Sequence, residues 1–73
     1  MENMEFYYKI DVMGRNGYSF MVKSNEELNE DEIISRCLDN GYFDDSLDAD
    51  YAVIDDLISQ YDIDNFSNCT FNI

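Results

Sequence analysis

The sequence predicts a small α+β domain of order ββααβ, in which a three-stranded, mostly antiparallel sheet carries two helices packed on one of its faces. Three observations predict this fold: two alternating apolar runs joined by a tight-turn sequence, a helical segment with capping residues, and a short alternating run near residue 73. A chain of 73 residues, 45% of them hydrophobic, suits one domain with a small core. We therefore interpret residues 1–73 as a single acidic domain, in which residues 1–5 form a loose tail.

A β-hairpin is the first predicted element. Apolar side chains alternate along residues 6–13, and residues 18–22 repeat the alternation. Between these runs, Gly14-Arg15-Asn16-Gly17 contains an Asn-Gly pair, which readily takes the positive φ angles of a tight hairpin turn. The first run is apolar on both faces, as in a central strand. The sequence leaves the partner of the last strand open, although a central first strand would favour pairing between the two.

A helix is predicted over residues 30–40. Asn29 is a good N-cap, and Glu32 three residues later can act as its capping-box partner. Gly41 provides the left-handed residue at which helices commonly end. The apolar stripe of this helix consists of Ile33, Ile34, Cys37 and Leu38.

The second predicted helix covers residues 49–61 and follows an acidic connector at residues 42–50. Strand alternation over this segment would mix Asp with Ile on both faces, whereas one helical face would collect five apolar side chains. These are Val53, Ile54, Leu57, Ile58 and Tyr61. A half-exposed final strand is predicted over residues 68–73, where Cys69, Phe71 and Ile73 alternate with polar residues.

The charge of the chain is strongly negative and unevenly distributed. There are 17 Asp and Glu residues against four Lys and Arg, which gives a net charge of −13 at pH 7. Residues 37–73 contain nine Asp and no Lys or Arg. Such a surface attracts cationic partners and repels nucleic acid and anionic membranes. We therefore expect a basic protein as the partner, and no direct binding of nucleic acid or membrane.

The residue types present exclude most enzyme mechanisms. The chain has no His, so it cannot build a Ser-His-Asp triad, a Cys-His pair or a zinc site with imidazole ligands. No glycine-rich phosphate loop is present. Two Asp-x-Asp sequences, at 48–50 and 62–64, begin like calcium loops but lack the glycine and the final glutamate that such loops need. We expect no catalytic activity, no metal site and no cofactor.

An acidic face is the predicted binding site. On the second predicted helix, with Asp48 and Asp62 at its two ends, the seven-residue spacing of Asp48, Asp55 and Asp62 would place these carboxylates in one stripe. Tyrosine flanked by acids is a suitable interface anchor. The complete set of predicted partner-binding residues is Asp44, Asp45, Asp48, Asp50, Asp55, Asp56, Asp62, Tyr42 and Tyr51. The alternative interpretation is that this is the solvated face of an amphipathic helix, although solubility alone is usually served by mixed signs and a smaller net charge.

In size, charge and absence of catalytic residues, the chain resembles the small acidic inhibitors encoded by bacteriophages and mobile elements, including anti-CRISPR, anti-restriction and uracil-DNA glycosylase inhibitor proteins. This compositional resemblance implies an inhibitor that occupies the basic groove of a host nucleic-acid-binding protein, most specifically a CRISPR effector, as a nucleic-acid mimic. The alternative hypothesis is an acidic adaptor or regulatory subunit that binds a basic surface without displacing nucleic acid. A third is a self-associating accessory protein, so both a monomer and a homodimer remain open.

The expected location is the cytoplasm of a bacterial host cell. The sequence shows no signal peptide and no long apolar run. Its two cysteines, Cys37 and Cys69, are then expected to be reduced.

Overall fold

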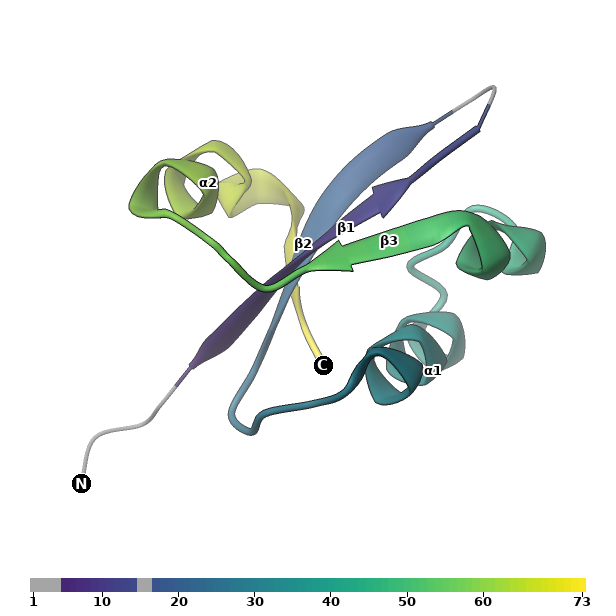
Figure 1. Ribbon diagram of the computed structural model, residues 1–73, viewed down its shortest axis with the longest axis horizontal. Coiled ribbons are helices and arrows are strands. Elements are labelled where there is room, and N and C mark those ends of the chain that lie inside the picture. Colours follow the sequence, from purple (N-terminus) through teal and green to yellow (C-terminus); the bar gives the residue numbers. More distant parts are fainter. Residues whose placement is uncertain (1–4, 15–16) are drawn as a thin grey trace.

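The computed structural model describes residues 5–14 and 17–73 (Figure 1). The strands are β1 (Phe6–Val12), β2 (Tyr18–Ser24), β3 (Ala52–Asp55) and β4 (Thr70–Asn72), and they form one sheet in the order β3-β1-β2-β4. The helical elements are α1 (Glu30–Asn40), the 3₁₀ turn η1 (Ser46–Tyr51), α2 (Gln60–Asn65) and the 3₁₀ turn η2 (Ser67–Cys69). The predicted α+β class is confirmed, but the sheet has four strands and is mixed.

The β1–β2 hairpin and the central position of β1 are confirmed. The two strands pair antiparallel, with Ile10 opposite Phe20. The predicted Asn-Gly turn and the predicted tail lie outside the described residues, apart from Glu5 and the two flanking glycines. A Cβ atom on Gly17 would come within 2.8 Å of the Val12 carbonyl oxygen, so only glycine fits the end of this turn without a shift of the backbone.

Helix α1 begins and ends where its capping residues predict. The Asn29 side chain accepts a hydrogen bond from the Glu32 N–H at 2.8 Å. Gly41 has a φ of 73°, and its N–H closes the last turn. Ile33 and Cys37 are fully buried against the sheet, while Leu38 at the edge of the predicted stripe is exposed. The helix is therefore held by one narrow apolar stripe and by a cap at each end.

The prediction of a helix over residues 49–61 is wrong. The segment instead contains the end of η1, the strand β3, a connection and the start of α2. Strand β3 pairs antiparallel with β1 over four residues, so that Ile54 lies opposite Ile10 and faces the core. In so short a strand the alternation puts Ala52 and Ile54 inside and leaves Asp55 exposed. The open edge of β1 therefore outweighs the helical periodicity of the apolar residues.

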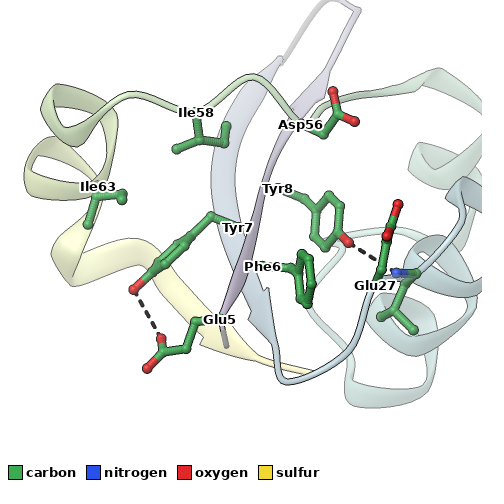
Figure 2. A pocket seen from close by; sticks show the side chains of 9 residues that line it. Glu5, Phe6, Tyr7, Tyr8, Glu27, Asp56, Ile58 and Ile63 are labelled. Carbon is green, nitrogen blue, oxygen red and sulfur yellow. Dashed lines mark hydrogen bonds between the residues drawn. The ribbon is translucent and has the colours of Figure 1, made fainter. Parts of the chain in front are cut away.

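The prediction that both helices pack on one face of the sheet is also wrong. Helix α1 covers the face with the main core, and α2 lies on the opposite side (Figure 1). A close view along β1 shows Tyr7, Ile58 and Ile63 on the α2 side, with Phe6 and Tyr8 on the other (Figure 2). The second face needs a cover because it is not polar throughout: the side chain of Met21, on β2, is fully buried outside the main core.

The last strand, β4, pairs with β2 and not with β1. It runs parallel to β2, with Phe71 opposite Val22. Strands β3 and β2 lie on the two sides of β1. The pairing of β1 with the last strand, which a central first strand would have favoured, therefore does not form. The Phe71 ring then packs against the Phe20 ring, with centroids 5.9 Å apart.

The core lies entirely in the first part of the chain. Every buried hydrophobic side chain of the described residues falls between Tyr8 and Phe43. None of the helices in the described ranges has the length and apolarity needed to cross a membrane.

Candidate functional site

A hollow of about 560 Å³ lies where the hairpin end of β1 meets η1. We call it the acid-tyrosine hollow. Its lining residues come from three segments, the end of β1, the start of β2 and the acidic connector with η1: Val12, Met13, Gly14, Tyr18, Asp44, Asp45, Asp48 and Tyr51. It thus collects three carboxylates and two phenol rings in a space large enough for a long side chain.

The pairing of β3 with β1 brings the two sides of the hollow together. The Met13 N–H donates to the Tyr51 carbonyl at 3.0 Å, which continues the β1–β3 ladder by one residue. The Asp45 side chain accepts from the Leu47 N–H at 2.9 Å and so caps η1. The short 3₁₀ turn therefore holds its acids at the hairpin end of the sheet.

Tyr18 fixes the acidic connector to the hairpin. Its hydroxyl donates to Asp48 Oδ2 at 2.7 Å and accepts from the Asp44 N–H at 2.9 Å. Burial is the largest cause of the raised pKa of Tyr18; the Asp44 N–H works in the opposite direction, and the Asp48 carboxylate adds to the rise. Tyr18 therefore keeps its proton near neutral pH and can hold both segments in place.

The carboxylates of the hollow differ in how far they are already used. Asp48 Oδ2 accepts from Tyr18 and also from the Asp45 N–H at 3.3 Å, so Asp48 is mainly structural. Asp44 is exposed, and its carboxylate has no partner among the described residues. It is the carboxylate best placed to receive a cation from outside.

The described basic residues are occupied elsewhere. Lys9 lies over the Phe66 ring, 5.3 Å from its centroid. Lys23 pairs with Glu5, and Arg36 pairs with Glu26 and Glu32. Arg15 lies outside the described residues. None of the three described cations thus neutralises the hollow.

Apolar groups are exposed around the hollow. Met13 and Tyr51 are each 61% exposed, and Leu47 is 65% exposed. A guanidinium or ammonium group entering the hollow could bond to carboxylates while its alkyl stem packed on Met13 or its charge lay over a tyrosine ring. The arrangement is suited to binding a Lys or Arg side chain of another protein.

Only part of the predicted site is brought together. Asp44, Asp45, Asp48 and Tyr51 line the hollow, and the exposed Asp50 precedes Tyr51 in η1. The remaining predicted residues lie elsewhere: Asp55 at the end of β3, Asp56 after it, Asp62 in the capping box of α2, and Tyr42 stacked on Phe71. The predicted stripe of Asp48, Asp55 and Asp62 on one helix is therefore wrong, because these residues belong to three different elements.

Four residues that line the hollow, Val12, Met13, Gly14 and Tyr18, were not predicted as site residues. The two that matter most for its contacts are Tyr18 and Met13. Each occupies a hairpin position that the sequence assigns to a strand. Their role depends on the pairing of β3 with β1. The sequence did not predict this pairing, because the periodicity of residues 49–61 indicated a helix. The adjacency of Met13 and Tyr18 to the turn was the only available signal.

Comparisons with family models, with curated proteins and with solved structures gave no match. Within residues 5–14 and 17–73, no three acidic or thiol side chains are grouped so that they could hold a metal ion.

Proposed function

We propose that this chain is a non-catalytic acidic protein that binds a basic, nucleic-acid-binding protein through the acid-tyrosine hollow and competes with nucleic acid for that surface. A CRISPR effector is the most specific target that the compositional resemblance implies. The observation that carries the proposal is the hollow itself: three carboxylates beside exposed Met13 and Tyr51, with the described cations held elsewhere.

Charge makes nucleic acid the natural competitor of such a protein. The grooves that grip duplexes use Lys and Arg to contact rows of phosphates. A surface with nine Asp and no base over residues 37–73 is attracted to the same grooves. Unlike a phosphate backbone, this surface also offers apolar contacts. At the hollow, the exposed side chains of Tyr51 and Met13 provide them. The hollow would then supply specificity, and the net charge would speed association.

A second candidate function is favoured because the predicted stripe of Asp48, Asp55 and Asp62 does not form. Without a row of evenly spaced carboxylates on one helix, the acids form a local cluster more than a copy of a phosphate backbone. Such a cluster suits an adaptor or regulatory subunit that binds one basic patch and leaves nucleic acid in place.

Affinity capture from bacterial lysate tests both candidates. The tagged protein would be used at low salt, with nuclease-treated and untreated lysates compared by mass spectrometry. Competition predicts that one nucleic-acid-binding protein is recovered and that nuclease improves its recovery. A ternary complex that keeps its nucleic acid when the purified proteins are mixed would support the adaptor instead, and recovery of only the bait would contradict both.

A further inference from the structure

A second surface lies at the opposite end of β1, where the strand has an open edge. On one side, β2 pairs with β1 from Phe6 onward. On the other side, β3 pairs with β1 only from Lys9 to Val12 and then leaves the sheet. Among the described residues, no strand pairs with β1 on this side over residues 6–8. The β1 edge is thus half covered.

Backbone hydrogen-bonding groups face this open edge. The N–H of Met13 donates toward the β3 side of β1. Backbone groups in a strand alternate in direction, so those of Lys9 and Tyr7 point to the same side. Lys9 lies opposite Asp55, the last residue of β3, whereas Tyr7 has no partner there. The Tyr7 N–H and carbonyl therefore form a template for one further strand.

A groove of about 360 Å³ follows the open edge (Figure 2). One wall consists of Tyr7, Ile58 and Ile63, and the other contains Phe6 and Tyr8. Leu28 also lines the groove and belongs to the second wall, since its backbone N–H donates to the Tyr8 hydroxyl at 3.0 Å. Leu28 and Tyr8 are both buried. An added strand would place alternate side chains against the two walls.

The rim of the groove is acidic. It carries Glu5, Glu27 and Asp56. Lys23 pairs with Glu5 at 3.6 Å, but neither Glu27 nor Asp56 has an ion-pair partner among the described residues. The groove therefore combines apolar walls with uncompensated negative charge.

We propose that the open edge of β1 takes an extended, basic and apolar segment of a partner protein as an added strand in line with β3. Main-chain hydrogen bonds to Tyr7 supply the alignment, the two walls take apolar side chains, and Glu27 and Asp56 select Lys or Arg. A second copy of this chain is a poor occupant, because each copy carries a charge of −13. The inference does not depend on the proposed function, since the hollow lies at the other end of β1.

A defined peptide tests the proposal with the wild-type protein. The probe is a capped heptapeptide with Lys at its first, fourth and seventh positions and Val at the other four, so that each wall receives Val side chains. The readouts are amide chemical shifts and hydrogen exchange by NMR. Binding is expected to shift the Tyr7 amide signal and to slow its exchange. A peptide N-methylated at its three central residues keeps the charge but loses strand hydrogen bonds, so its affinity should fall by roughly tenfold or more. Equal affinity of the two peptides would overturn the proposal.

Charge reversal provides the matched test on the protein. Replacing Glu27 and Asp56 together by Lys should weaken peptide binding by roughly tenfold, whereas Asp31→Lys with Asp39→Lys on α1 changes the net charge equally and should have a much smaller effect. Equal losses in the two double variants would overturn the proposal. So would shifts confined to the hollow, or protection of the Tyr7 amide that rises with protein concentration without peptide and thereby identifies a second copy as the occupant.

Discussion

The two halves of the molecule are stabilised in different ways. Residues 5–43 contain every buried hydrophobic side chain of the described residues, whereas residues 44–73 contain none that is fully buried. The second half is held instead by the four-residue pairing of β3, the three-residue pairing of β4 and the side-chain caps of η1 and α2. Its apolar contribution to the core comes from partly buried side chains that pack against it, namely Ala49, Ala52, Ile54 and Ile73. The acids of residues 44–73 therefore lie outside the buried core, which stays apolar.

The largest difference between the halves is expected in the cost of removing an apolar side chain. Ile33→Ala should lower the free energy of unfolding by about 3 kcal/mol, because Ile33 is only 1% exposed and a cavity would remain. Leu57→Ala should cost less than about 0.5 kcal/mol, because that side chain is 85% exposed. Urea unfolding followed by circular dichroism measures both. Similar costs at the two sites would show that the second half has a core of its own.

The next largest effect is expected from alkaline pH and depends on the buried thiol. Burial raises the pKa of Cys37 from 9.0 to about 11, so the unfolded chain releases this proton at a lower pH than the folded one. The contribution of Cys37 is complete below pH 9 and is lost as the pH rises toward 11, on the order of 2 kcal/mol in total. The raised pKa values of Tyr7 and Tyr18 act in the same direction at higher pH.

Matched cysteine variants separate this effect. Cys37→Ala should flatten the fall in unfolding free energy between pH 9 and 10, and Cys69→Ala should leave it unchanged because Cys69 is exposed. Denaturant titrations at a series of pH values give the comparison. An unchanged slope in Cys37→Ala would contradict the assignment.

The smallest of these effects concerns the two helix caps. Asn29→Ala removes the cap of α1, whose stripe is buried in the core, and should cost about 1 kcal/mol of global stability. Ser59→Ala removes the cap of the six-residue α2, which has no buried residue. It should leave the unfolding midpoint nearly unchanged and should speed hydrogen exchange of the α2 amides. An equal global cost for both caps would mean that α2 unfolds only together with the core.

The sequence predicted the first half of the fold well and the second half poorly, for a physical reason. The signals at Asn29, Gly41 and the hairpin turn are local, so they can be interpreted without knowing the neighbours. The choice between helix and strand for residues 52–55 depends on the open edge of β1, which lies about 40 residues away along the chain. A local periodicity cannot contain that information.

The candidate site, like the fold, was predicted only where its residues are neighbours along the chain. Asp44, Asp45, Asp48 and Tyr51 come together because they follow one another along a connector and a 3₁₀ turn. Asp62 was grouped with them through a predicted helix that does not form, and Tyr42 was chosen as a tyrosine flanked by acids. The structure places both residues outside the hollow. Tyr18, which fixes the connector, could be assigned to the site only from the tertiary fold.

The most direct test of the central claim is the affinity of the captured partner for charge-reversed variants, with and without nucleic acid. Asp44→Lys changes an exposed carboxylate of the hollow that has no described partner, and Asp64→Lys makes the same charge change on α2, outside the hollow. The account predicts that Asp44→Lys weakens binding by roughly tenfold or more, that Asp64→Lys has a much smaller effect, and that added nucleic acid displaces the wild-type protein. Equal losses in both variants would mean that net charge alone drives binding and would contradict a site at the hollow.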